Sequence, residues 1–420
     1  MRLESDATLQ AACASLRHLG LVPLVQVELV SVPRDRTWWV CQTTPTCHNG
    51  ARRTWSSCVP SGLQASRISM QTPSCLNLVG ASRAELAALL GDLDPRPYRV
   101  EQVHRWVARR LVGSVEEMTN LPKQLRESLS RRAVLRDPEI ADIRRGGEGT
   151  AKFALSYPGG TVVEAVAMPM EGHTTLCLSS QAGCAVGCVF CVTGVLGAGR
   201  NLSGGEIFGQ YRAIMRHEGL VGTSVNVVFM GMGEPLLNLP GVTRAVELLA
   251  ETVSPRRVTV STSGIVPGLE KLAVLERRPK LAVSLNATTQ AQREKLMPIA
   301  ARWTLDELLS ALRAFPLERG RRITFEYVML AGINDSPDDA RRLPRLLRGI
   351  PCKVNLIPLN PDERYLGGFA APDEATISAF AGILAAAHVN VTVRWSKGRD
   401  VAAACGQLRG QITTRPTAQA

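Results

Sequence analysis

From residue 174 onward, strand-like and helix-like segments alternate, and this alternation constrains the fold more than any other feature. Apolar runs typical of buried strands recur six times over about 220 residues, with helical patterns between them. Such repetition favours a parallel sheet with helices, in the α/β class. Six units are too few for an eight-fold barrel, so we expect a partial (βα)6 barrel with its chemistry at the C-terminal ends of the strands. The expected strands are 175–178, 225–230, 257–260, 281–285, 323–329 and 354–357, and the expected helices include 205–216, 242–251, 305–314 and 338–347.

The sequence patterns divide the region before the barrel into three parts. Helical segments expected at 84–90 and 98–111, with a third opening at Asn120, indicate a small basic helical domain, and runs at 152–157 and 161–168 around a Pro-Gly-Gly turn indicate a β-hairpin. The first 75 residues hold five of the eleven cysteines and show weak periodicity. We expect 1–75 unassigned, disordered or upstream of a start at Met70, 76–136 as the helical RNA-binding domain, 137–170 as a β-hairpin connector, 171–414 as the barrel and 415–420 as a tail.

Net charge and cysteine content indicate the kind of partner and the cellular compartment. The formal net charge of +12 suits a polyanionic partner, nucleic acid first, although a basic surface alone would give the same excess. No leader and no apolar stretch of about 18 residues is visible, so we expect a cytoplasmic chain with no membrane partner and reduced thiols. The candidate RNA-binding residues are Arg105, Arg109, Arg110, Arg131, Arg132, Arg136, Arg394, Lys397 and Arg399.

Three cysteines follow the first barrel strand with the spacing C-x3-C-x2-C. Cys184, Cys188 and Cys191 can bind three irons of a [4Fe-4S] cluster and leave the fourth iron open for a ligand. Gly183 and Gly187 let the backbone bend around such a core. A three-ligand zinc site is the alternative for this triplet. A second zinc site, from Cys41, Cys47, His48 and Cys58, is conceivable, but its spacings match no pattern of paired ligands.

Five sequence blocks together, over residues 76–414, resemble one family. With them the chain resembles the radical S-adenosylmethionine (SAM) superfamily and, within it, the RNA adenine C2 methyltransferases that act on 23S ribosomal RNA and some transfer RNAs. The blocks are TLCLSSQAGC at 175–184, GMGEPLLN at 231–238, STSG at 261–264, NLIPLN at 355–360 and AACGQ at 403–407.

The resemblance implies the cofactors and the residues that bind them. It implies one [4Fe-4S] cluster and two SAM molecules per turnover. Gly233 and Glu234 would contact the methionine end of SAM. The family often has His where this chain has Asn286, and each polar residue here is also compatible with an ordinary turn or cap. The residues implied to hold ribose and adenine are Ser261, Ser284, Leu285, Asn286 and Asn360.

The resemblance also implies a relay between two further cysteines. Read alone, Cys177 and Cys405 would each be buried structural cysteines, and Glu164 an ordinary polar residue of a half-exposed strand. In the family pattern, Cys405 takes a methyl group from SAM, and radical chemistry then joins that carbon to adenine C2. Glu164 removes the C2 proton, and Cys177 releases the methylated RNA as a disulfide forms.

The sequence therefore predicts a radical SAM enzyme that methylates adenine C2 in the peptidyl-transferase region of 23S ribosomal RNA and in transfer RNA. Flavodoxin or ferredoxin is the expected electron donor, and the expected state is a monomer. Two alternatives stay open. One is an adenine C8 methyltransferase of the same family, which shares the triplet and both relay cysteines. The other is a non-catalytic RNA-binding protein with a structural metal site.

Overall fold

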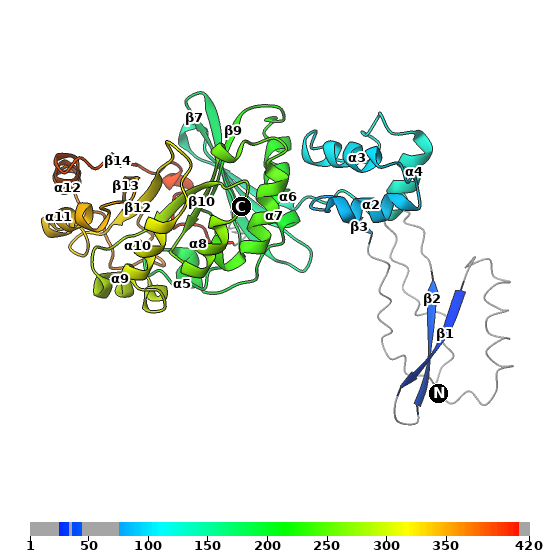
Figure 1. Cartoon of the computed structure of the whole chain (residues 1–420), viewed down its shortest axis with the longest axis horizontal. Coiled ribbons are helices and arrows are strands. Elements are labelled where there is room, and N and C mark those ends of the chain that lie inside the picture. The colour runs from blue at the N-terminus through cyan, green and yellow to red at the C-terminus, as the bar shows by residue number, and fades with distance from the viewer. Residues whose placement is uncertain (1–24, 33–35, 44–74, 411–420) are drawn as a thin grey trace, which may run out of the picture. The chain divides into compact units, whose positions relative to one another are not determined.

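The computed structural model describes residues 25–32, 36–43 and 75–410 (Figure 1). The chain divides into two compact units, 1–76 with 121–134, and 77–120 with 135–420. In the first unit, strands β1 and β2 form an antiparallel pair, and α4 leads into the short strand β4. The bounds are β1 Val25–Val32, β2 Arg36–Thr43, β3 Leu76–Asn77, α4 Lys123–Arg132 and β4 Ala133–Val134.

The second unit is built on one sheet of ten strands in the order β14-β13-β12-β11-β10-β9-β8-β7-β6-β5. Strands β8 to β14 are parallel to one another, whereas β5 to β8 are antiparallel. No pairing joins β14 to β5 in the described part of the chain, so the barrel is open. The bounds are β5 Glu139–Arg145, β6 Ala151–Ser156, β7 Val162–Met170, β8 His173–Cys177, β9 Val225–Phe229, β10 Val258–Thr262, β11 Lys280–Ser284, β12 Ile323–Met329, β13 Cys352–Pro358 and β14 Val391–Val393.

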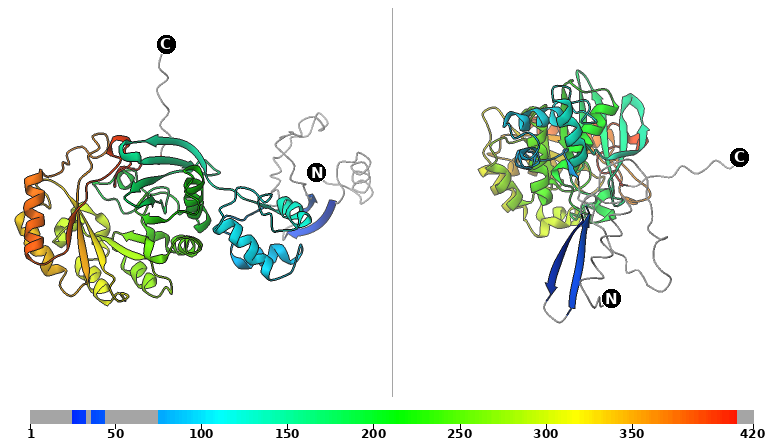
Figure 2. Two further views of the ribbon diagram at one scale, coloured as in Figure 1. Left: turned by 90° about the horizontal axis from the view of Figure 1, so that it is seen from above. Right: turned by 90° about the vertical axis from the view of Figure 1, so that its right-hand side faces the viewer.

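Helices connect the parallel strands along the outer side of the curved sheet (Figure 2). Fully buried side chains such as Phe229, Phe325 and Tyr327 fill the core between the two layers. The bounds are α5 Val192–Leu196, α6 Gly204–His217, α7 Leu239–Leu249, α8 Val266–Ala273, α9 Gln290–Leu296, α10 Leu305–Ala314, α11 Pro337–Leu346 and α12 Glu374–Ala386, with 3-10 turns at Gly147–Gly149, Pro235–Asn238, Pro255–Arg257, Pro298–Ala301 and Arg399–Val401.

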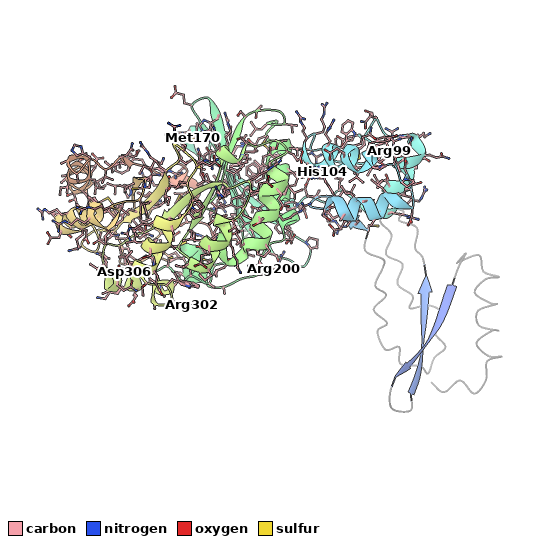
Figure 3. All side chains as sticks on the ribbon, in the orientation of Figure 1. Arg99, His104, Met170, Arg200, Arg302 and Asp306 are labelled. Carbon is pink, nitrogen blue, oxygen red and sulfur yellow. The ribbon has the colours of Figure 1, made fainter. Side chains whose placement is uncertain are left out.

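Capping explains where several helices begin. Ser203 accepts a hydrogen bond from the backbone N–H of Glu206, and the Glu206 carboxylate accepts one from Ser203 N–H, which fixes the start of α6. Arg200, labelled in Figure 3, pairs with the same carboxylate at 2.6 Å. Equivalent capping boxes begin α2 at Ser82 and α10 at Thr304.

Residues 77–120 pack on the barrel through a buried guanidinium and a close backbone approach. Helices α2 (Arg83–Gly91) and α3 (Tyr98–Ala108) belong to this segment. The Arg212 side chain, from α6, is fully buried and donates to the carbonyls of Val107 and Val112. A Cβ atom on Gly80 would lie 2.3 Å from the Cα of Gly205, so the two glycines allow the backbones to touch.

A polar cluster joins α3 to the residues after α7. Arg83 donates to Glu101 at 3.3 Å and to Glu251 at 3.0 Å. His104, labelled in Figure 3, is buried beside them, with Nδ1 at 3.8 Å from a Glu251 oxygen. Because a guanidinium already lies between the two carboxylates, we interpret this group as an ion-pair network and not as a metal site.

The predicted α/β fold is confirmed, and each of the six predicted barrel strands coincides with an observed one. Several elements differ. The helix expected over 98–111 ends at Ala108, and strands β1 to β5 were not predicted. Within the described residues, no helix combines the length and the apolar character needed to cross a membrane.

Candidate active site

The three predicted cluster cysteines lie on one tight loop between β8 and α5. The loop closes where Cys184 N–H donates to the carbonyl of Gly197 at 2.7 Å. Gly183 has φ +134°, and a Cβ atom there would lie 2.7 Å from the backbone N of Gly199. Only glycine fits this backbone position, which explains the residue before the first cysteine.

Cys184, Cys188 and Cys191 suit an iron–sulfur cluster better than a single ion. Burial raises the pKa of the Cys184 thiol to about 12, and burial with the neighbouring cysteines raises the pKa of Cys188. Thiols in such surroundings lose their protons only when a cation binds them. Three thiolates can bind three different irons of one cubane, whereas a structural zinc site needs four protein ligands.

The GMGE segment after β9 packs directly on the start of the cysteine loop. Met232 O accepts from Ser180 N–H at 2.9 Å, and a Cβ atom on Gly233 (φ +95°) would lie 2.5 Å from Gln181 Cβ. Glu234 is buried, and its carboxylate accepts from the backbone N–H groups of Leu236 (3.0 Å) and Ser263 (2.7 Å). Burial raises the pKa of Glu234. A carboxylate in this position is suited to a cationic ligand.

The residues predicted to hold ribose and adenine lie at or after the ends of later strands. Ser261 is half-buried in β10 and Ser284 half-buried at the end of β11, whereas Leu285 is fully buried. Asn286 has φ +57°, and its side-chain oxygen accepts from Val328 N–H at 2.9 Å. That amide therefore already holds β12 against the loop after β11, and its contact with SAM stays a prediction.

The two predicted relay cysteines line one pocket, although they are about 228 positions apart in sequence. Burial raises the pKa of the Cys177 thiol to about 12, and Cys405 adds to the shift. Arg394 reaches the same pocket, and the proximity of Cys405 raises the pKa of its guanidinium. The lining residues are Met168, Cys177, Val228, Met230, Arg394, Ser396, Lys397, Ala403, Ala404, Cys405 and Leu408.

Hydrogen bonds hold the loop that carries Cys405 from two sides. Asn360 donates to Cys405 O at 3.1 Å and to Ser396 Oγ at 3.0 Å. From the cluster loop, Val192 N–H donates to Gly406 O and Thr193 Oγ1 donates to Leu408 O, both at 2.7 Å. Asn360 was predicted to contact SAM; in the structure its amide holds the Cys405 loop, and its contact with SAM stays a prediction.

Glu164 lies buried on β7 and takes part in an ion pair. Lys152, on β6, places its Nζ 3.0 Å from one carboxylate oxygen, and both side chains are only 5% exposed. The other oxygen accepts from the backbone N–H of Arg409 at 2.7 Å. Lys152 also donates to Ala402 O at 3.1 Å. The pair therefore connects the sheet to the chain on both sides of Cys405.

Sequence reasoning did not find Lys152, Ser263 or Arg293 as site residues. The Ser263 hydroxyl is buried without a hydrogen-bond partner, beside Glu234 and Arg293. A signal existed for Lys152, a lysine in the otherwise apolar run of β6. Of the alternative zinc ligands, Cys47, His48 and Cys58 lie outside the described residues. None of the cysteines whose side chains the structure describes forms a disulfide: Cys75, Cys177, Cys184, Cys188, Cys191, Cys352 and Cys405.

Comparison with known proteins decides the family. Residues 76–135 match the family model described as the ribosomal RNA large subunit methyltransferase N-terminal domain, and residues 178–343 match that of the radical SAM superfamily. A dual-specificity RNA methyltransferase RlmN from Anaeromyxobacter dehalogenans (strain 2CP-C) is 48% identical over 336 residues, which cover 78% of this chain and 90% of that protein. The chain belongs to the RlmN family.

Two further similarities agree with membership of the RlmN family. A protein of the same description from Anaeromyxobacter sp. (strain Fw109-5) is 46% identical over 78% of this chain and 88% of its own length. The crystal structure of a radical SAM methyltransferase from Sphaerobacter thermophilus is 42% identical, with a TM-score of 0.75 over 80% of this chain and all of that one. The predicted enzyme class, a radical SAM RNA methyltransferase with a [4Fe-4S] cluster held by three cysteines and with SAM, is thereby confirmed.

Proposed function

We propose that this chain methylates C2 of adenine in the peptidyl-transferase region of 23S ribosomal RNA and in transfer RNA, through a methylated cysteine and a covalent protein–RNA intermediate. The observation that carries the proposal is the shared pocket of Cys177 and Cys405. The relatives are dual-specificity RNA methyltransferases, which supports two RNA substrates.

The cofactors would be held next to this pocket. Cys184, Cys188 and Cys191 would bind the cluster, and Glu234 would accept hydrogen bonds from the amino group of SAM. When bound, the two cofactors supply the methyl group and the hydrogen-atom abstraction that makes its carbon reactive. We propose flavodoxin or ferredoxin as the electron donor and a monomer as the working state.

The relay uses the chain's own groups. The Cys405 sulfur takes the methyl group by displacement, with S-adenosylhomocysteine as the leaving group, and the Arg394 guanidinium lines the same pocket. The bond from this carbon to adenine C2 joins protein to RNA. Once the C2 proton and one electron, which the bound cluster would accept, have left the ring, the Cys177 thiolate attacks the Cys405 sulfur. The sulfur–carbon bond breaks, the released carbon takes up a proton to become the methyl group, and a disulfide forms. A thiol reductant restores both cysteines.

Glu164 is the proposed base for the C2 proton. In this structure both of its oxygens are engaged, one by Lys152 and the other by the Arg409 N–H. The Arg409 contact has to open before the carboxylate can reach a bound base. RNA would therefore displace the segment after Cys405.

Mass spectrometry of nuclease-digested RNA tests the reaction. The product should be 2-methyladenosine, and 8-methyladenosine in its place would establish the C8 alternative. RNA without either nucleoside, from cluster-loaded protein supplied with SAM and a reductant, would contradict the proposal.

The relay is tested by trapping. Cys177→Ala should accumulate a covalent protein–RNA adduct, because the thiol that releases the RNA is missing. Cys352→Ala is the matched control, since Cys352 is half-buried in β13 and does not line the pocket. Denaturing gels with labelled RNA measure the adduct. Equal amounts of adduct in both variants would exclude the proposed role of Cys177.

A further inference from the structure

Arg293 is a fully buried cation without an acidic partner. Its side chain lies on α9 with 0% of its surface exposed. The guanidinium donates to the carbonyl of Ser263, and its Nε has no hydrogen-bond partner. Among the ion pairs of the described residues none includes Arg293, and burial lowers its pKa to about 10. A buried charge is costly unless an opposite charge is supplied, so the chain alone leaves this group incomplete.

The cysteine loop is the neighbouring segment that can supply negative charge to Arg293. Helix α9 packs against that loop, because Val189 N–H donates to Leu296 O at 3.1 Å and Phe190 packs with Leu296 and Met297. Cys188 is packed in the same cluster and is the residue whose charge favours the protonated guanidinium. The guanidinium is held in place by its hydrogen bond to the Ser263 carbonyl, and the N–H of the same residue donates to the Glu234 carboxylate.

We propose that Arg293 is the counter-charge of the thiolate-bound iron–sulfur cluster. The inference rests on the cluster site of the family and on none of the relay steps. Three thiolates on a [4Fe-4S]²⁺ core give a net charge of −1, and one-electron reduction makes it −2. A fixed positive charge beside the cluster stabilises the −2 state more than the −1 state. Arg293 thereby raises the reduction potential and helps retain the iron.

The same guanidinium offers hydrogen bonds to a carboxylate, so the methionine end of SAM is the competing occupant. The two occupants make different predictions. A counter-charge of the cluster acts before SAM is added, whereas a carboxylate contact changes only the affinity for SAM. Measurement without SAM therefore separates them.

The test compares Arg293→Gln, which removes the charge, with Arg293→Lys, which keeps it. Full-length protein is reconstituted anaerobically, its iron is counted, and the cluster is titrated against applied potential by EPR without SAM. In Arg293→Gln we expect the ratio of reduced to oxidised cluster at a fixed potential to fall by about tenfold, which is about 59 mV for one electron. Arg293→Lys should stay within about twofold of the unchanged protein, which is the rescue that charge alone predicts.

Two results would each support the inference. One is the shift in reduction potential, and the other is loss of iron in Arg293→Gln with retention of iron in Arg293→Lys. Unchanged potential and iron in Arg293→Gln, or equal damage in both variants, would overturn it, and so would a change confined to SAM binding measured by calorimetry. If Arg293→Gln does not fold, Arg293→Met provides the uncharged variant under the same criteria. Cys405→Ala should show the unaltered potential, so a failure of the relay stays distinguishable from a failure here.

Discussion

Replacing Lys152 with methionine should destabilise the protein far more than loss of a surface lysine would. The change removes the cation 3.0 Å from the Glu164 carboxylate and leaves that carboxylate buried, at 5% exposure, with the Arg409 N–H. It also removes the donor to Ala402 O. Methionine fills a similar volume, so the effect comes from charge and hydrogen bonding and not from a cavity.

The magnitude follows from the geometry of the pair. At 3.0 Å and an effective dielectric constant of 20, Coulomb's law gives about 5 kcal/mol. Removal of one partner of a buried pair typically costs about 3–5 kcal/mol, which agrees. For Lys152→Met we therefore expect a loss of about 3–5 kcal/mol in the free energy of unfolding. The double variant with Glu164→Gln should recover a large part of it, because no unpaired charge then stays buried.

Guanidinium unfolding of the cluster-free protein, followed by circular dichroism, measures these differences. The matched control is Lys123→Met, since Lys123 is 85% exposed and lies 3.9 Å from Glu127. It should cost less than about 0.5 kcal/mol. The reasoning is refuted if Lys152→Met lies within about 1 kcal/mol of the unchanged protein, or if Glu164→Gln adds its own cost to the double variant without rescue.

Three further predictions concern single residues. Because burial raises the pKa of Cys177 to about 12, its alkylation by iodoacetamide should be slow at pH 8 and should accelerate up to about pH 12, and labelling at pH 8 as fast as free cysteine would contradict this. Gly80→Ala should lower the melting temperature more than Gly159→Ala, since both have positive φ but only Gly80 meets backbone, at Gly205; equal losses would exclude the contact. Burial raises the pKa of Glu234, so the affinity for SAM, measured by calorimetry, should fall on acidification at a pH above the usual carboxyl range. Glu234→Gln should abolish this pH dependence.

The sequence was sufficient for the barrel because its strands are mostly central in the sheet and each carries a run of apolar residues. It was not sufficient for β5, which is the edge strand of the sheet and carries Asp142, Arg144 and Arg145 on a partly exposed surface. Such a strand shows no run of apolar residues. The helix expected to reach Leu111 stops at Ala108, because Arg212, about 100 positions away, takes the carbonyls of Val107 and Val112. A tertiary contact of this kind leaves no local pattern.

The candidate site was also only partly predictable from the sequence. Spacing alone identified the three cluster cysteines, whereas the pairing of Cys177 with Cys405 came only from resemblance, since nothing local connects residues so far apart. The Lys152–Glu164 pair depends on sheet register. Ala154 lies opposite Glu164, and Lys152, two residues away, shares its face as a diagonal neighbour. Register is set by the whole hairpin and cannot be read from either residue.

The segment after β14 returns across the open barrel to β6, β7 and the cluster loop, and this gives the enzyme an order of assembly during translation. Strands β5 to β14 pair in the order in which they leave the ribosome. The Cys405 segment emerges after all of these strands, about 214 positions after Cys191, which at about 5–20 residues per second is roughly 10–40 s later. A chain that stops before Cys405 therefore carries the cysteine loop without the proposed relay thiol, and without Gly406 O and Leu408 O to hold that loop.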